Sequence, residues 1–419
     1  MAITTPDICW YKNKSWADLT AIALTCVLLV VLPIPHTIAL RLTTLFLATT
    51  IVASRATRHE WSLLPLKWPL LIWLVVQLLS LTTAVSWPYS LNAIKSQTWY
   101  GFLVYILFFF QCREEKIARL FIVVPLVVLA LLALGGLAEW ISLASAVAPT
   151  SIYDGVGAFT TYGVSVFPLL VIVALSEKSG WYSKATLAAL FLLLLVTVYL
   201  GGNRMFWLAF AVEIIMFSSL LPYRHASYRK KWLYGTAAAC LFLAAALIFY
   251  NILQLRTGTE ADGFEEVITT TIVNDPRWPL WQFCVAKIYE HPLWGAGFGL
   301  GSFARAYPQW PLRNPLLWHA HNVLLNYGIE MGLPGIIAFL WLMWKIIKRS
   351  WTVYRTSPLY QARLVAVSAI ALVFGVLAKN MTDDFFYQDL ALLFWAIVGG
   401  ILGYFSGLPK TTVPADSGS

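Results

Sequence analysis

Long apolar runs, repeated along the chain, are the feature that most constrains its fold. A predominantly apolar run of about 20 residues crosses the hydrocarbon core of a bilayer as one helix. Because 59% of the residues are hydrophobic and 12% are charged, a soluble globular protein is excluded. The sequence therefore predicts an all-α polytopic membrane protein, with residues 1–419 as a single membrane domain. We expect twelve transmembrane helices, near residues 17–34, 37–54, 67–86, 97–112, 120–140, 158–176, 184–202, 204–221, 233–251, 321–344, 363–381 and 389–406.

The distribution of lysine and arginine predicts the orientation of these helices. Cytoplasmic loops of membrane proteins carry an excess of both residues. If the N-terminus lies inside, the cytoplasmic segments hold 20 of the 29 lysines and arginines, which also explains the net charge of +9 without a nucleic-acid partner. The cytoplasmic cations are Lys12, Lys14, Arg55, Arg58, Lys67, Arg113, Lys116, Arg119, Lys178, Lys184, Arg224, Arg229, Lys230, Lys231, Lys345, Lys348, Arg349, Arg355, Arg363 and Lys410.

An even number of spans places both termini in the cytoplasm and the longest loop, residues 252–320, on the opposite face between spans 9 and 10. This loop should be partly helical. Asp275 and Pro276 are typical of a helix start, and His291-Pro292 is typical of a helix end. Arg277 lies in the first turn of that helix, where free backbone N–H groups favour an anion. The glycine-rich residues 295–301 should form a tight, close-packed turn.

His321 and Asn322 stand at the outer end of the tenth apolar run. One interpretation of His321 is a polar residue that closes a membrane helix, and the other is a catalytic base. His319 makes a metal site conceivable, but residues two apart do not share a helix face. No carboxylate or cysteine cluster accompanies the two histidines in the sequence, and the five cysteines have no paired spacing. We therefore expect neither a metal site nor a disulfide.

A short motif favours the interpretation of His321 as a catalytic residue. His321-Asn322, nine further residues and then Gly332-Leu333 resemble the signature of the O-antigen ligase and O-antigen polymerase family of bacterial membrane glycosyltransferases. The layout of twelve spans with a large outer loop before the histidine is also similar to that family. The resemblance implies a fold of the GT-C type, a metal-independent inverting reaction without a cofactor, and a place in the bacterial inner membrane.

Two arginines on the outer face are candidates for binding an anionic substrate. Arg204 opens the eighth span after two glycines, and Arg277 opens the loop helix. The planar guanidinium fork suits a phosphate, although Arg204 could equally be an anchor that reaches the membrane surface. The resemblance implies that both arginines bind the pyrophosphate of the donor.

Three further residues are assigned to substrate binding. Asn322 follows the histidine, and Asp383 and Asp384 lie in a short outer connection. Either carboxylate could orient His321 or bind a sugar hydroxyl, and a solvated loop is the alternative. Lys379, four residues before Asp383, could pair with it. Glu330 lies too far along the helix from His321 to orient its ring.

Together with the resemblance, these residues predict a glycosyl transfer on the periplasmic face. That face has no ATP, so the donor must arrive activated, as a glycan on undecaprenyl or another polyprenyl pyrophosphate. Arginines would stabilise the charge of the leaving group, and His321 would take the proton of the acceptor hydroxyl. The favoured activity is O-antigen ligase, with the lipid A core of lipopolysaccharide as acceptor and membrane lipids as surroundings. The alternatives are O-antigen polymerase, protein O-oligosaccharyltransferase and, from a different class, a lipid-linked glycan transporter.

Overall fold

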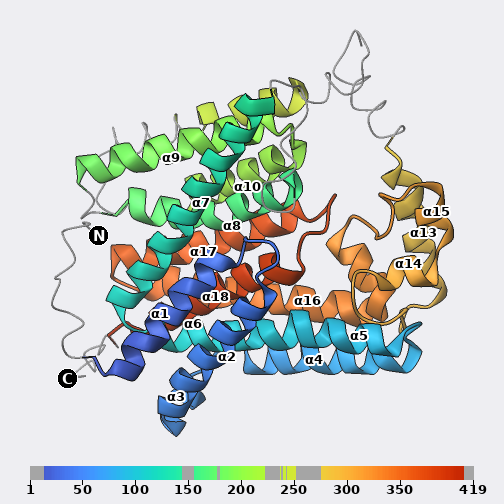
Figure 1. Cartoon of the computed structure of the whole chain (residues 1–419), viewed down its shortest axis with the longest axis horizontal. Helices are drawn as coiled ribbons and strands as arrows, with labels where there is room; N and C mark the ends of the chain where they lie inside the picture. Colours follow the sequence, from blue (N-terminus) through green and yellow to red (C-terminus); the bar gives the residue numbers. More distant parts are fainter. Residues whose placement is uncertain are drawn as a thin grey trace, which may run out of the picture.

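The computed structural model describes residues 14–143, 155–176, 180–221, 236, 239–241, 243–251 and 275–409, and these residues form helices and loops without a strand. Figure 1 shows a bundle of long helices, with the three helices α13, α14 and α15 gathered at one end. The helices are α1 (Trp16–Val31), α2 (Ile38–Arg55), α3 (Arg58–Ser62), α4 (Lys67–Ser80), α5 (Trp87–Ala93), α6 (Tyr100–Gln111), α7 (Glu115–Leu143), α8 (Val156–Ala174), α9 (Trp181–Leu200), α10 (Arg204–Leu220), α13 (Arg277–Glu290), α14 (Ser302–Ala306), α15 (Gln309–Arg313), α16 (Val323–Thr356), α17 (Tyr360–Lys379) and α18 (Gln388–Gly407).

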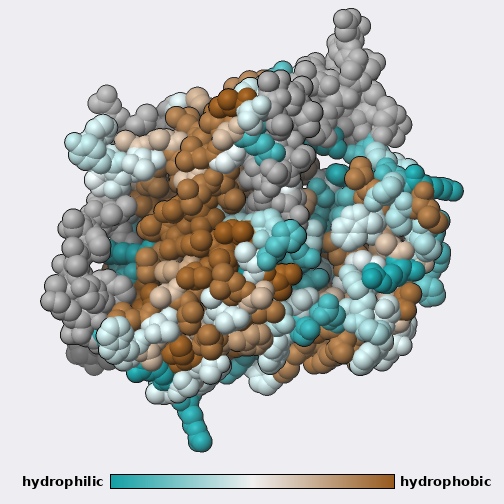
Figure 2. All heavy atoms as spheres, viewed as in Figure 1, coloured by the Kyte–Doolittle hydropathy of each residue, from teal (hydrophilic) through white to brown (hydrophobic). Residues whose placement is uncertain are grey.

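The helices confirm an all-α polytopic membrane protein. Seven of those that the structure describes are long and apolar enough to cross a bilayer: α2, α7, α8, α9, α16, α17 and α18. Each of the other five predicted spans coincides with a shorter helix or helical segment. Apolar side chains cover the middle of the face shown in Figure 2, and hydrophilic ones gather toward the end that carries α13–α15. The bundle thus presents a hydrocarbon-facing surface between two polar ends.

The two ends of the described chain meet at one end of the bundle. Lys14 precedes α1 and Gly407 closes α18, and both line the same hollow. The backbone of Gly407 also packs against that of Arg113, just before α7. This arrangement agrees with an even number of membrane crossings between the first and the last helix.

Two predicted boundaries were wrong. The tenth span was expected to end at 344, but α16 continues to Thr356, because lysine and arginine are good helix formers and allow a helix to continue past the membrane surface. Residues 86–96 were expected to form an outer connection. Instead α5 begins at Trp87 with a proline in its first turn, and a π-helical segment, Ile94–Trp99, joins it to α6.

The outer segment from residue 275 onward has a small core of its own. The predicted helix is confirmed as α13, and its buried face presents Leu280, Cys284 and Ile288. Phe303 and Ile329 pack into the same apolar cluster. This cluster joins the outer segment to the start of α16, and so it fixes the position of α13 relative to the membrane helices.

The glycine-rich turn is confirmed as a close-packed element, and it stabilises a break in α16. Gly332 has φ 71° and ψ −167° inside α16, and Pro334 follows it. Such a break frees helix carbonyl groups that need new donors. The N–H groups of Ala296 and Gly297 donate to the carbonyls of Ile329 and Glu330 at 2.8 and 3.0 Å. The glycine of the short motif therefore bends α16 where the outer segment docks.

We expect Gly332→Ala to destabilise this junction. A Cβ at Gly332 would lie 2.7 Å from the carbonyl oxygen of Pro292, and a left-handed φ disfavours any other residue. The strained backbone alone costs about 1–3 kcal/mol, so the Tm in detergent should fall by several degrees. Gly135→Ala in α7 is the matched control, because nothing lies within 4 Å of its added Cβ. Equal Tm values for both variants would show that the backbone break at Gly332 does not stabilise the junction between α16 and the outer segment.

Candidate active site

His321 lies in the loop that leads into α16, with its side chain held between two acceptors. Its Nδ1 lies 3.1 Å from the Asp383 carboxylate, and its Nε2 lies 2.6 Å from the backbone carbonyl of Leu316. The residue is 7% exposed and has φ 51°. A non-glycine residue in this left-handed region is strained, and such strain is often found at functional sites.

Asp383 and Asp384 occupy different environments, although both were predicted as substrate-binding residues. Asp383 contacts His321, and burial raises its pKa, but the His321 hydrogen bond and the nearby cations outweigh burial and hold the pKa below its ordinary value. Asp384 is 4% exposed and accepts hydrogen bonds from Asn326 Nδ2 and Phe386 N. Burial raises the pKa of Asp384 to about 6. In this structure Asp383 orients the histidine, and Asp384 holds the loop.

Both polar atoms of the Asn322 side chain make hydrogen bonds within the protein. Its Oδ1 caps α16 by accepting the N–H groups of Leu324 and Leu325, and its Nδ2 donates to the Met381 carbonyl at 2.8 Å. The helix cap fixes the entry to α16, and the contact with Met381 ties that entry to the loop that carries Asp383. The structure thus places Asn322 beside His321 as a positioning residue, and its predicted contact with substrate stays a prediction.

The two predicted arginines meet at the start of α13. Arg204 Nη2 lies 2.8 Å from Asp275 Oδ2, and the other oxygen of Asp275 accepts the backbone N–H of Arg277 at 2.9 Å. Arg277 Nη1 donates to the Thr382 carbonyl at 2.6 Å. A guanidinium carries five N–H donors, so these contacts leave donors for a ligand.

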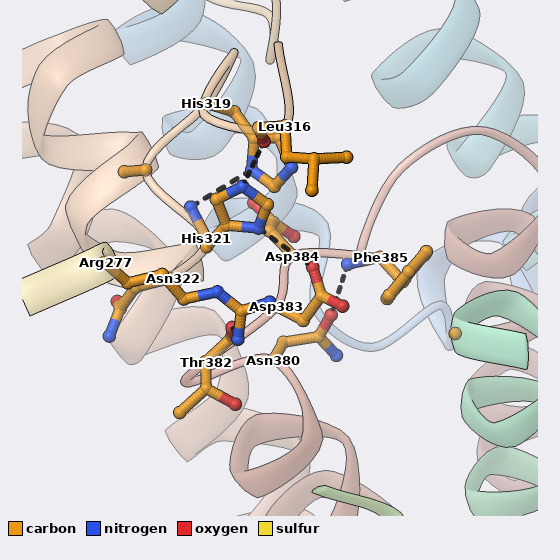
Figure 3. Close-up of polar contacts among 12 residues, drawn as sticks. Arg277, Leu316, His319, His321, Asn322, Asn380, Thr382, Asp383, Asp384 and Phe385 are labelled. Atoms are coloured by element: carbon orange, nitrogen blue, oxygen red, sulfur yellow. Dashed lines mark hydrogen bonds and ion pairs between the residues drawn. The ribbon is translucent and has the colours of Figure 1, made fainter. Parts of the chain in front are cut away.

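Arg204, Asp275, Arg277, Thr382, Asp383 and His321 form one continuous path. Each is linked to the next by an ion pair, a hydrogen bond or a peptide bond. The close-up in Figure 3 shows Arg277 reaching Thr382 and His321 lying beside Asp383. The structure therefore brings together residues from α10, α13, the start of α16 and the α17–α18 connection. Their catalytic roles stay predictions.

His319 changes the argument about a metal. The sequence argument assumed a helix, but both histidines lie in a loop, and their ring centroids are 3.8 Å apart. His319, His321 and Asp383 bring three possible ligand atoms within 4.8 Å of one another. His319 Nδ1 accepts the His321 backbone N–H at 3.1 Å, and burial holds its pKa well below the ordinary value. A bound metal would have to displace contacts that now hold both rings.

Sequence reasoning missed Asp275 as a site residue and placed Lys379 in the wrong contact. Asp275 was identified only as a helix start, and its contact with Arg204 spans 71 positions in the chain. Lys379 was expected to pair with Asp383, but its buried Nζ has no hydrogen-bond partner within the described residues and lies 5.1 Å from the Phe385 ring centroid. Arg256, Arg305 and Arg313 share the long loop without a comparable local argument, and the sequence indicates that they contact solvent or lipid headgroups. Arg305 instead stacks on Tyr89, with 3.7 Å between its Cζ and the ring centroid. Arg256 lies outside the described residues.

Comparison with known proteins finds a family model that matches part of the chain. Residues 189–340 match the model of the family described as O-antigen ligase. The match includes Arg204, Arg277 and His321. This match covers less than half of the chain, and it supports similarity to the O-antigen ligase family. The match agrees with the resemblance carried by the His321-Asn322 motif and with the helical membrane architecture.

A curated relative supports the same similarity over a shorter stretch. A Rickettsia conorii protein named putative polysaccharide ligase is 32% identical over 97 residues. The aligned part covers 21% of this chain and 23% of the relative. The chain thus spans less than a quarter of the curated relative that it matches.

Proposed function

We propose that the protein is an O-antigen ligase that moves a glycan from a polyprenyl pyrophosphate, such as undecaprenyl pyrophosphate, to the lipid A core of lipopolysaccharide. The observation that carries this proposal is the path from Arg204 to His321, which sets two cations beside an imidazole–carboxylate pair. The site would face the periplasm of the bacterial inner membrane, and both termini would lie in the cytoplasm. The cation distribution and the shared hollow of Lys14 and Gly407 support this orientation.

The arginines suit the departing pyrophosphate. Bond cleavage at the anomeric carbon leaves growing negative charge on the leaving oxygen, and fixed guanidinium groups stabilise that charge most strongly in the transition state. Asp275 holds Arg204 at the start of α13, and the Thr382 carbonyl holds Arg277. Both groups are therefore positioned before the donor arrives. Attack by the acceptor from the opposite side would invert the anomeric centre.

His321 suits the proton transfer, after one local change. Asp383 faces Nδ1, so Nε2 is the nitrogen that can take the acceptor proton. In this structure Nε2 faces the Leu316 carbonyl, which accepts and cannot donate. Two acceptors satisfy the ring fully only when it is doubly protonated, as after proton uptake. We infer that the acceptor hydroxyl replaces the Leu316 carbonyl before reaction.

The test is a transfer assay with purified protein, polyprenyl-pyrophosphate glycan and separate acceptors. Transfer to lipid A core, and not to free glycan or peptide, is the expected result. Transfer to glycan instead would identify a polymerase, and transfer to peptide would identify a protein O-oligosaccharyltransferase. Movement of the donor across liposomes without transfer would identify a transporter. Retained activity after dialysis against EDTA is expected for a metal-independent reaction, and loss that Mg²⁺ or Zn²⁺ restores would assign a metal to His319, His321 and Asp383.

Asp383→Asn should lower kcat and leave the donor KM nearly unchanged. The amide cannot stabilise the charged imidazole that forms on proton uptake, so a loss on the order of 10²-fold is expected. Steady-state kinetics with varied donor separate the two constants. Glu290→Gln is the matched control, since Glu290 is exposed at the end of α13 and its carboxylate pairs, among the described residues, with Lys287. An unchanged kcat in Asp383→Asn would remove the carboxylate from the mechanism.

A further inference from the structure

Two polar hollows of similar size lie at the end of the bundle opposite the candidate active site. The first, of about 560 Å³, contains three cations and three carboxylates. Each cation in it pairs with one carboxylate: Lys14 with Glu114, Arg55 with Asp18, and Arg113 with Glu60. The net charge of the side chains in this hollow is therefore zero without a bound ligand.

The second hollow, of about 510 Å³, is not balanced in this way. Lys67, Lys345, Lys348 and Arg349 line it, and no acidic side chain does. We call it the basic groove. None of these four cations makes an ion pair with any residue that the structure describes. Four cations in one hollow repel one another, so the groove favours an anion from outside the chain.

The basic groove opens at the level of a membrane surface. Lys345 lies 22 positions after Val323, which is at most about 33 Å because α16 bends at Gly332, and this is close to the thickness of a hydrocarbon core. The groove is therefore at the interface opposite His321. Trp68 and Trp341 also line it, and Trp68 is 65% exposed. Tryptophan is enriched at lipid headgroup level.

The wall formed by residues 64–69 is fixed before any ligand arrives. Tyr105 donates its hydroxyl to the Pro65 carbonyl at 2.6 Å, and Leu66 has φ 63°. The first turn of α4 begins here without a side-chain cap, so its free N–H groups add to the positive potential of the four side chains. The groove is thus a built feature of the α4–α16 junction.

We propose that the basic groove binds the phosphate headgroup of an anionic phospholipid in the leaflet opposite the candidate active site. The four cations match the phosphate, and the tryptophans contact the glycerol and upper acyl region. A lipid fits better than a soluble anion because the groove combines charge with interfacial aromatic residues, and basic pockets between membrane helices are known to take anionic headgroups. This site does not depend on the proposed glycosyl transfer.

The experiment compares lipid retention in three forms of the full-length protein by native mass spectrometry. Protein reconstituted with equal phosphatidylglycerol and phosphatidylcholine should retain a bound phosphatidylglycerol. Lys345→Gln/Lys348→Gln/Arg349→Gln should lose it, with affinity weaker by on the order of 100-fold, at roughly fivefold for each cation. Arg58→Gln/Lys184→Gln/Arg355→Gln removes the same charge from the same predicted face outside the groove, and it should retain the lipid.

Three other results would each overturn the proposal that the basic groove binds an anionic phospholipid. Equal loss in the two triple variants would show that net charge on this face, and not the groove, attracts the lipid. Equal retention of phosphatidylcholine would remove the anionic requirement. Displacement of the lipid by millimolar inorganic phosphate or glycerol 3-phosphate would assign the groove to a soluble anion. Circular dichroism and elution volume show that each variant is folded.

Discussion

His321→Ala should reduce glycan transfer by about 10²- to 10⁴-fold, the usual contribution of a positioned general base. The alanine removes the only ring that contacts the Asp383 carboxylate in the described structure. Donor binding should persist, because Arg204 and Arg277 are held by Asp275 and Thr382 and not by the histidine. The measurement is single-turnover transfer to lipid A core, together with a separate donor-binding titration.

Two controls separate this effect from loss of folding. His291→Ala changes an exposed histidine at the end of α13 and should transfer glycan like the parent. His319→Ala removes the acceptor for the His321 backbone N–H, so it should lower transfer less than His321→Ala does. Transfer at the parental rate in His321→Ala would exclude the imidazole as the base.

The helical spans followed from local sequence. An apolar run between charged residues can do little in a bilayer except form a helix, because every backbone N–H and C=O must be paired within the span. For that reason α8, α17 and α18 lie close to the predicted ranges. The start and end of α13 also followed from nearby residues, since an Asp-Pro start and a His-Pro end act on the adjacent backbone.

The polar contacts of the site did not follow from sequence in the same way. Asp383 was one of two candidate carboxylates, and only packing distinguishes it from Asp384, which the Asn326 side chain draws into the interior. The Arg204–Asp275 pair joins two helices that are distant in the chain. A family motif can indicate which residue types matter, but it carries no information about which acid faces which base.

The position of His319 likewise could not be predicted from local sequence. A rule for helical spacing was applied to residues that the structure places in a strained loop, where His321 has φ 51°. In that loop the two rings approach each other as they could not on one helix. Left-handed backbone at a non-glycine residue depends on tertiary contacts, here the His319 ring and the Asn322 cap, and no local pattern predicts it.

Loss of both arginines should abolish detectable donor binding. Hydrogen bonds to a charged group contribute about 1.5–3 kcal/mol, so each of Arg204→Ala and Arg277→Ala should weaken donor affinity by roughly 10- to 150-fold. Titration with polyprenyl pyrophosphate in nanodiscs measures this affinity. Arg313→Ala is the matched control, because Arg313 is exposed at the end of the nearby helix α15. Unchanged affinity in both single variants would exclude the arginines from the donor site.

A substitution of Asp275 tests more directly whether Arg204 contacts the donor. When Arg204 is removed, the Asp275 carboxylate that it neutralised stays beside the expected pyrophosphate and repels it. Arg204→Ala/Asp275→Asn should therefore bind donor more tightly than Arg204→Ala alone, although more weakly than the parent. Such non-additivity is expected only for residues that act at one site. If the two substitutions simply added, Arg204 and Asp275 would be a structural pair away from the donor, and the pyrophosphate would have to bind through Arg277 alone.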